Sequence, residues 1–370
     1  MTPLSACVIG SELPFEIAPP GLTGIPRVVV RTHAALLKEL SHPLIELVPV
    51  STRSRIPAQG RSHSESITND PLNDLAFRPL EDIDLLLMLG LNMRTDFVRI
   101  FNERRRRRLP VISLIYDTIV LKHPEWFLDH GRTHFRAYLQ QLLRVSDHVV
   151  VPSTTVQDDL LGLGWNIAGQ VHVLPLGTSF RQQVPMTLPS DPLRLLYVST
   201  VAPYKGHALL LDAFDAIKDR GTSVELQIVG RQGWNADQIA RRIRGHKDFG
   251  TLITWEQTAD DHVVMERART SHIAVIPTQS EGFGLFQEEA LSLGMKVVAQ
   301  DIPVLRERPY PNVMYSAGNA RDMASAILTA HARPYIPLAD QPVRTMTDFA
   351  SDLRSLILDE LLQGGGAIRG

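Results

Sequence analysis

The chain has little cysteine, few aromatic residues and almost no net charge. Cys7 is the only cysteine among 370 residues, so no internal disulfide can form, and a reducing cytoplasm is the expected location. Aromatic side chains make up 6% of the chain, and the formal net charge is −2. General binding to nucleic acid needs an excess of positive charge. We therefore expect no nucleic-acid partner.

Long apolar runs are also missing. No window of 18 residues is continuously apolar, and the N-terminus lacks the basic stretch of a signal peptide, so neither a membrane span nor a signal peptide is expected. The hydrophobic share of 44% and the charged share of 21% are typical of globular proteins. A chain of this length favours two domains of about 180 residues each.

What is present is a regular alternation of short apolar runs and longer amphipathic segments. The runs predict strands at 5–9, 45–50, 84–89, 111–115, 148–151, 193–198, 224–229, 252–254, 273–276 and 296–299. Such alternation is typical of an α/β protein, here with two Rossmann-like, doubly wound domains. The proline-containing segment 178–192 has no periodicity and is predicted to be a linker. The predicted parts are a domain at 1–180, a domain at 181–345 and a helix within 346–370.

The segment PTQSEGFGLFQEEA, residues 277–290, follows a predicted buried strand and opens a helix. A loop at the carboxyl end of a strand, leading into a helix N-terminus, suits a phosphate. Gly282 and Gly284 allow the backbone to approach a ligand, and Glu281 and Glu289 can accept hydrogen bonds from vicinal hydroxyls. Glu288 is expected to face solvent. A purely structural interpretation, with turn glycines and a first-turn carboxylate, remains open for this segment taken alone.

A second candidate segment is STVAPYKGH, residues 199–207, directly after the strand LRLLYV. Lys205 lies at the start of a helix, where the helix dipole disfavours a cation. A lysine in that place suggests an anionic ligand such as a diphosphate. A third segment, GRQGW, follows the next strand, and Arg231 within it could either reach phosphate or lie on the surface.

Together these three segments resemble the retaining GT-B glycosyltransferases of family four, the group 1 glycosyltransferases. The E-x7-E motif of that family is similar to Glu281…Glu289, VSTVAPYKGH resembles the subgroup pattern V-G-T-x-x-P-R-K-x-H, and VGRQGW resembles its second strand and turn. That subgroup includes mannosyltransferases of polysaccharide and O-antigen assembly. The resemblance covers most of 193–330. It implies a GT-B fold, in which an N-terminal acceptor domain and a C-terminal donor domain face a cleft.

The resemblance also implies roles for single residues. Lys205 would hold the donor diphosphate, Glu281 the hydroxyls of the donor sugar, and Glu289 the ribose. Phosphate and sugar would further meet the backbone N–H groups of Phe283, Gly284 and Leu285. Two positions depart from the subgroup pattern, since Tyr204 replaces an arginine and Ser199 a glycine. One positive charge on the diphosphate is thus missing, and Arg231 or an arginine of the first domain would have to compensate.

The first half of the chain matches the family more loosely. LTGIPRV, residues 22–28, resembles a glycine-containing loop at the interdomain cleft, which makes Gly24 and Arg27 candidate donor contacts. Tyr116 and Asp117 stand where the family has a His-Asp pair, so they are candidates on the acceptor side. Because that histidine usually touches the donor sugar, Tyr116 suggests altered sugar recognition. Ser153 is interpreted as a helix N-cap, and the C-terminal helix would pack back on the first domain.

The candidate catalytic residues are Asp117, Lys205 and Glu281. A leaving phosphate needs charge stabilisation more than acid catalysis, and Lys205 with the helix N-terminus would supply it. The resemblance implies retention of anomeric configuration. A double displacement needs a carboxylate beneath the anomeric carbon, and the sequence identifies none. Front-face substitution is therefore the preferred hypothesis, with a leaving-phosphate oxygen accepting the acceptor's proton.

No cofactor and no metal are expected, because the nucleotide sugar is itself a co-substrate. Asp82-Ile83-Asp84 matches D-x-D, which binds a metal in another transferase class, but it precedes a strand of the wrong domain. No histidine or cysteine cluster has zinc spacing. The interpretation favoured for the two aspartates is a pair of carboxylates at a strand entry.

Five consecutive arginines, Arg104–Arg108, end a predicted helix. They suit a solvated face near the negative end of the helix dipole, or contact with anionic lipid at the inner face of the cell membrane. The expected partners are a nucleotide-sugar donor of mannose type and a saccharide or polyprenyl-linked saccharide acceptor. The alternatives are a UDP- or dTDP-sugar donor, or a non-catalytic sugar-nucleotide-binding scaffold on the same fold. An epimerase is disfavoured by E-x7-E.

Overall fold

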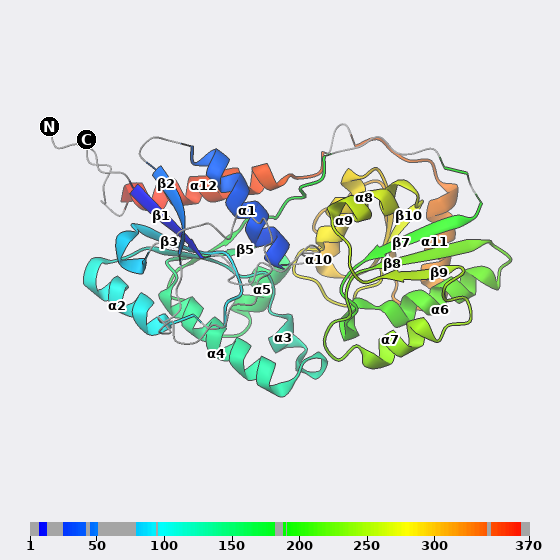
Figure 1. The fold of residues 1–370 in the computed structure, drawn as a ribbon, viewed down its shortest axis with the longest axis horizontal. Coiled ribbons are helices and arrows are strands. Elements are labelled where there is room, and N and C mark those ends of the chain that lie inside the picture. Colours follow the sequence, from blue (N-terminus) through cyan, green and yellow to red (C-terminus); the bar gives the residue numbers. More distant parts are fainter. Residues whose placement is uncertain are drawn as a thin grey trace, which may run out of the picture.

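Two lobes lie side by side, each built on a parallel six-stranded sheet (Figure 1). The structure, a computed structural model, describes residues 7–12, 25–41, 45–50, 79–93, 95–181, 188–189, 191–338 and 342–363. The first sheet has the order β2-β1-β3-β4-β5-β6. Its strands are β1 (Cys7–Glu12), β2 (Ile45–Val50), β3 (Leu85–Met88), β4 (Val111–Leu114), β5 (His148–Val151) and β6 (Gln170–Val173).

Helices cover the first sheet on both faces, which is why its central strands are apolar throughout. Every residue of β3 and of β4 is buried, as expected of parallel strands packed on two sides. One face packs against α1 (Ile25–Glu39) and α12 (Met346–Gln363). The other packs against α2 (Phe97–Arg107), α4 (Asp129–Val145) and α5 (Thr154–Leu161). Three short helices complete the domain: η1 (Leu80–Asp82), α3 (Ile119–Lys122) and η2 (Pro124–Trp126).

The second sheet has the order β12-β11-β10-β7-β8-β9. Its strands are β7 (Leu193–Val198), β8 (Val224–Val229), β9 (Ile253–Glu256), β10 (Ile273–Ile276), β11 (Lys296–Gln300) and β12 (Val313–Ser316). Its helices are η3 (Pro203–Lys205), α6 (His207–Lys218), α7 (Asp237–Arg244), α8 (Asp261–Arg269), α9 (Leu285–Ser292), α10 (Pro303–Arg306) and α11 (Ala320–Ala332). In Figure 1, α6 and α7 lie on one side of this sheet and α8 and α9 on the other.

The order of the second sheet creates a topological switch point. From β7 the chain proceeds outward to β8 and β9, and it then returns to β10 on the opposite side of β7. The loops that follow β7 and β10 therefore leave neighbouring strands toward opposite faces, which opens a crevice at the carboxyl edge of the sheet. Open α/β sheets bind their ligands in this crevice.

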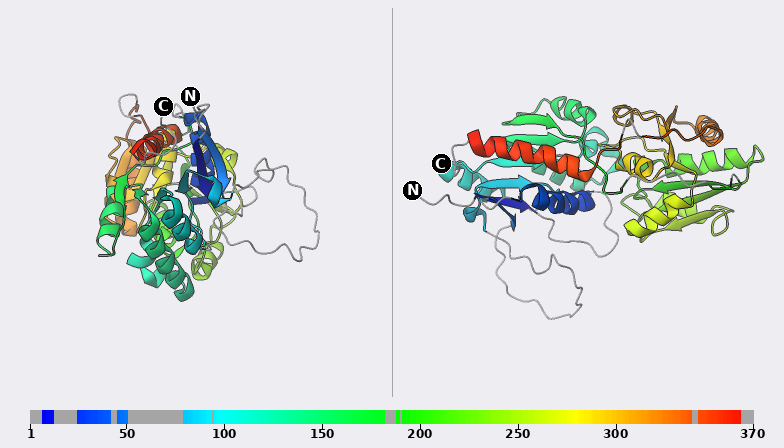
Figure 2. Two further views of the ribbon diagram at one scale, coloured as in Figure 1. Left: turned by 90° about the vertical axis from the view of Figure 1, so that its left-hand side faces the viewer. Right: turned by 90° about the horizontal axis from the view of Figure 1, so that it is seen from above.

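The chain crosses between the lobes twice, and the two crossings are hydrogen-bonded to each other. The N–H of Thr178 donates to the carbonyl of Arg344 at 2.9 Å, and the N–H of Met346 donates to the carbonyl of Thr178 at 2.9 Å. Phe180, just past the first crossing, packs in the core of the second lobe. After the second crossing α12 runs along α1, as the right-hand view of Figure 2 shows. The last helix thus shares the core of the first lobe.

None of the helices in the described residues is both long enough and apolar enough to cross a membrane.

Candidate functional site

The loops after β7 and β10 are held together by a backbone oxygen. The carbonyl of Tyr204 accepts hydrogen bonds from the N–H of Gln279 at 2.8 Å and from the hydroxyl of Thr278 at 3.3 Å. The two sequence segments singled out above, 199–207 and 277–290, therefore meet at the switch point of the second sheet.

Lys205 and Glu281 form an ion pair at this point. Lys205 Nζ donates to Glu281 Oε1 at 2.5 Å, and both side chains are largely buried. The hydroxyl of the fully buried Tyr197 donates to the carbonyl of Lys205 at 2.7 Å and thereby fixes its backbone. The lysine charge is compensated by the carboxylate, and an anionic ligand would have to replace or share that partner.

Two glycines determine the path of the loop between Glu281 and α9. A Cβ on Gly282 would lie 2.0 Å from the carbonyl oxygen of Tyr116 and 2.9 Å from Cβ of Asp117. Only a residue without a side chain allows this approach between the two lobes. Gly284 has φ +85°, in the left-handed region that glycine adopts without strain, and it is the N-cap of α9.

The two residues between and after these glycines pack against the first lobe. Phe283 is buried and Leu285 is partly buried, and both contact the core cluster that contains Tyr116 and Phe349. The loop is therefore anchored on both sides of the cleft.

Glu289 is buried on α9 and faces the first lobe. It is 3% exposed and forms an ion pair with Arg27 of α1, which is itself 8% exposed. Arg27 also donates to Asp261 of α8 at 3.3 Å, and Arg31 pairs with the same aspartate. Burial lowers the pKa of Arg27 to about 10, which leaves it charged at neutral pH. The two candidate donor residues Arg27 and Glu289 are thus brought into direct contact.

Tyr116 and Asp117 follow shortly after the end of β4 and lie next to Gly282. Asp117 Oδ1 accepts a hydrogen bond from the N–H of Ile119 at 3.0 Å. The pKa of Asp117 is raised, chiefly because the carboxyl is buried and to a smaller extent by the negative charge of Glu281. The hydrogen bond from Ile119 and the positive charge of Lys205 lower this pKa but do not cancel the rise. The hydroxyl of the buried Tyr116 donates to the carbonyl of Leu89 at 2.8 Å. The proton of that hydroxyl is therefore already used in a hydrogen bond within the first lobe.

Tyr204, the substitution for the subgroup's arginine, belongs to an aromatic cluster between the lobes. Its ring stacks on Trp126 with centroids 5.2 Å apart and lies 6.0 Å from Phe127 and 6.3 Å from Trp234. Lys205 Nζ lies 4.9 Å from the centre of the same ring, a cation–π distance. Trp126 and Phe127 were not among the predicted site residues. Their signal was the pair Trp-Phe in PEWF, shortly after Asp117.

The expectation that Glu288 faces solvent is wrong. Glu288 is fully buried, accepts a hydrogen bond from the hydroxyl of Tyr310 at 2.7 Å and pairs with Arg308 at 2.7 Å. Arg308 also donates to the carbonyl of Phe283 and stacks on its ring. This buried ion pair supports the loop from behind. Helical periodicity alone could not reveal it, because α9 is covered on all sides.

Ser153 caps a helix and also joins the lobes. Its hydroxyl oxygen accepts from the N–H of Val156 at 3.1 Å, as expected of an N-cap, and the hydroxyl donates to the carbonyl of Gly282 at 2.7 Å. Glu307 of the second lobe accepts from the N–H groups of Thr154 and Thr155 at the start of the same helix. The cap was predicted, whereas the link between the lobes was not.

The remaining predicted residues lie apart from this centre or outside the described part. The side chain of Arg231 is exposed after β8. Gly24 lies outside the described residues. Asp82 and Asp84 precede β3, at the amino edge of the first sheet, whereas the cleft lies at the carboxyl edge.

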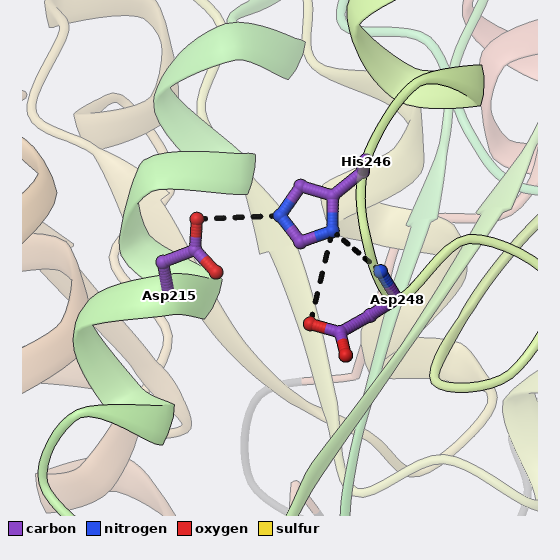
Figure 3. A group of neighbouring side chains, drawn as sticks. All are labelled: Asp215, His246 and Asp248. Atoms are coloured by element: carbon purple, nitrogen blue, oxygen red, sulfur yellow. Dashed lines mark hydrogen bonds and ion pairs between the residues drawn. The ribbon is translucent and has the colours of Figure 1, made fainter.

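Within the described residues, one group has the spacing of metal ligands, namely Asp215, His246 and Asp248 (Figure 3). The N–H of Asp248 donates to His246 Nδ1 at 3.2 Å, so Nε2 carries the proton and donates to Asp215 Oδ2 at 3.2 Å. Lys218 donates to Asp248 at 2.6 Å and lowers the pKa of that aspartate. These bonds link α6 to the loop after α7. That no metal is required stays a prediction.

The arginine run ends α2, and most of its members are engaged within the protein. Arg104 pairs with Asp147, and Arg107 donates to the carbonyls of Leu80 and Ile83. Arg106 and Arg107 both pair with Glu103. Arg105 and Arg108 are exposed.

Comparison with known proteins identifies the second lobe. The family model described as "Glycosyl transferases group 1" matches residues 192–333. Residues 192–333 belong to the group 1 glycosyl transferases. The serotype-specific mannosyltransferase WbdA of Escherichia coli is 30% identical over 269 residues, which is 67% of this chain and 33% of WbdA. A glycogen synthase of Mycobacterium tuberculosis is 26% identical over 214 residues, 54% of this chain and 48% of that protein. This chain therefore spans about one third of the length of WbdA.

Solved glycosyltransferase structures share the whole two-lobed fold. The lipopolysaccharide outer core galactosyltransferase WaaB superimposes with a TM-score of 0.62 and 15% identity, covering 96% of this chain and 99% of WaaB. A sucrose-phosphate synthase of Thermosynechococcus elongatus gives 0.60 and 18%, covering 96% and 98%. The expected GT-B fold is confirmed, and the site described above lies between the two domains that define it.

Proposed function

We propose that this chain is a retaining glycosyltransferase that moves a hexose, of mannose type, from a nucleoside diphosphate sugar to a saccharide or lipid-linked saccharide in surface polysaccharide assembly. The observation that carries the proposal is the pair Lys205 and Glu281 at the switch point of a group 1 domain. A lysine charge suits a diphosphate, and the carboxylate suits sugar hydroxyls. The mannose preference rests on the likeness to WbdA.

In the proposed arrangement the second domain holds the donor. Lys205 and the N–H groups of residues 283–285, at the start of α9, bind the diphosphate, where the helix dipole favours negative charge. Glu281 accepts hydrogen bonds from the donor sugar. Glu289 accepts them from the ribose, with Arg27 holding its carboxylate in place and offering a second positive charge to the diphosphate. Arg27 would in this way supply the positive charge that is missing because Tyr204 stands where the subgroup has an arginine.

In the proposed reaction the acceptor attacks from the face that the diphosphate leaves. A bond forms between the acceptor oxygen and C1 of the sugar, the bond from C1 to the phosphate oxygen breaks, and the acceptor's proton passes to a leaving-phosphate oxygen. The charge that develops on the phosphate is stabilised by Lys205. Asp117 is a carboxylate of the first domain whose pKa is affected by the charge of Lys205, and it would orient the acceptor hydroxyl. No step requires a metal or a cofactor.

The reaction is tested by product analysis with GDP-mannose and mannose-terminated acceptors. The product is expected to carry an α-linked mannose, as in the donor, with unchanged yield in EDTA. Intact-protein mass spectrometry of Asp117→Asn with donor distinguishes the mechanisms. A mass increase of one hexose would contradict front-face substitution, because it reveals a covalent glycosyl-enzyme.

A cytoplasmic location and contact with anionic lipid also belong to the proposal. The contact with lipid would depend on the exposed Arg105 and Arg108, since the other three arginines of the run are paired within the protein. Flotation with liposomes of phosphatidylglycerol is expected to carry the protein, and the double variant Arg105→Glu with Arg108→Glu is expected to stay behind. Equal flotation of both proteins would remove the arginines from the proposal.

A further inference from the structure

A cavity of about 300 Å³ lies in the first domain beside the donor site. It runs between the face of α4 that carries Gly131, Phe135 and Tyr138 and the segments that follow β3 and β4. Tyr204 and Trp234 of the second domain also line it. Its volume is at the lower end of the range of small-molecule sites, about 300–1,000 Å³.

The wall of this cavity offers almost no free hydrogen-bonding groups. The hydroxyl of Tyr116 is bound to the carbonyl of Leu89, and that of Tyr138 donates to the carbonyl of Gly90 at 3.2 Å. Both tyrosines therefore present their rings. The rest of the lining is aliphatic and aromatic, and its polar side-chain groups are the carboxylate of Asp117, the hydroxyl of Tyr204 and the indole N–H of Trp234. A sugar would lose most of its hydrogen bonds to water here without replacement, whereas an apolar group has none to lose.

Three of the large apolar side chains that line the cavity are exposed to water. Leu91 is 42% exposed, Met93 48% and Trp234 37%. Single exposed apolar residues are ordinary, but here three line the same cavity, which is typical of a binding site.

The cavity adjoins the reacting groups. Asp117 and Tyr204 belong both to its wall and to the surroundings of Lys205, whose Nζ lies over the Tyr204 ring at 4.9 Å. A group that fills the cavity would thus be attached close to the hydroxyl that receives the sugar.

We propose that this cavity binds an apolar aglycone, an alkyl or isoprenoid chain, carried by the acceptor. The inference rests on the proposed transferase function and names the acceptor class for that site. Binding would remove the chain from water, and burial of only two methylene groups is enough for a gain of about tenfold in affinity.

Gly131 provides a variant that fills the cavity without harming the fold. A Cβ added there meets no heavy atom within 4 Å, and Gly131 is the third residue of α4, where leucine is a better helix former than glycine. Gly131 lies on the same face of α4 as the lining residues Phe135 and Tyr138, so the side chain of Gly131→Leu is expected to enter the cavity. Gly131→Ala is the matched control, since it removes the glycine and leaves most of the space.

The test is calorimetry of the full chain with octyl and methyl glycosides of mannose, glucose and galactose, below the micelle concentration. For the wild type and Gly131→Ala, each octyl glycoside is expected to bind at least about tenfold tighter than its methyl counterpart. In Gly131→Leu the preference should fall below about threefold.

Absent binding of the octyl glycosides, or a preference that survives in Gly131→Leu, would overturn the inference. Nucleotide-sugar binding is titrated in the same proteins and reports on the transferase proposal separately. Intact donor binding with no octyl preference would reject the aglycone site and leave the transferase proposal standing. Absent donor binding with a preserved octyl preference would reject the transferase proposal and reduce the cavity to an apolar binding site without an acceptor.

Discussion

Lys205 occupies a position that is electrostatically unfavourable for a positive charge unless a ligand or another side chain compensates it. It sits just before α6, where the helix dipole repels a cation, and in the structure Glu281 and the ring of Tyr204 compensate its charge. A diphosphate would do so more completely. Lys205→Ala is therefore expected to lower kcat/KM for transfer by at least about 100-fold, measured by initial rates.

The control for this variant is Arg242→Ala, which removes an exposed cation of α7 that pairs with the exposed Asp212. Its kcat/KM should stay within about twofold of the wild type. A similar loss in both variants would mean that net charge, and not the position of Lys205, governs the rate.

Asp117 makes stability depend on pH. Burial raises the pKa of its carboxyl above the ordinary value of 3.8 in the folded protein, whereas in the unfolded chain the carboxyl keeps its ordinary pKa. As the pH rises from about this ordinary value through the raised pKa, the unfolded state loses its proton first, and the free energy of unfolding therefore falls. Asp117→Asn removes this cost and can keep the hydrogen bond from Ile119. Its Tm is expected to exceed that of the wild type at pH 7, and the difference should shrink toward pH 4.

Thermal melts at both pH values check this expectation. A Tm below that of the wild type at pH 7, or a difference independent of pH, would show that the carboxylate stabilises the fold in its ionised form.

At the scale of single elements, the loop between β10 and α9 depends on Gly282. A side chain there would clash with the backbone of Tyr116 in the other domain, and overpacking of this kind costs about 1–3 kcal/mol. Gly282→Ala is expected to lower both Tm and transfer activity. Gly131→Ala, where a Cβ meets nothing, is the control for stability and should leave Tm unchanged. Unchanged activity in Gly282→Ala would mean that the loop need not contact the first domain.

Most strands could be predicted because buried parallel strands are short apolar runs. LRLLYV and VELQIV were predicted with the bounds that β7 and β8 have. β6, with the sequence QVHV, was missed because it alternates polar and apolar residues and lies at the sheet edge. The helix α4 begins at Asp129, although the apolar spacing typical of a helix starts only at Phe135, since the first turns are polar and exposed. Their apolar spacing is too weak to detect.

At the scale of the whole molecule, the candidate site could be predicted only in part. E-x7-E and the lysine turn are local patterns, so Glu281, Glu289 and Lys205 could be named as candidates from the sequence. Their partners come from distant parts of the chain, as Arg27 does for Glu289. Local spacing contains no information about such pairs, and the same holds for the bond from Ser153 to Gly282.

The C-terminal helix is a structural part of the first domain. Phe349 is fully buried among side chains of α1 and the first sheet, although more than 300 residues separate α12 from α1 in the sequence. Phe349→Ala is expected to destabilise the protein by about 3–5 kcal/mol, measured by urea unfolding. Leu362→Ala, at an exposed site of the same helix, serves as control, and equal effects would argue that α12 is not docked.

The central claim is that the switch point of the second domain binds a nucleoside diphosphate sugar. It is tested most directly by calorimetry with GDP-, UDP- and dTDP-sugars on the wild type, Lys205→Ala and Glu289→Ala. The account predicts that one nucleotide class binds and that each variant loses at least about tenfold in affinity. Binding of no class by the wild type, or equal binding by Lys205→Ala, would contradict it.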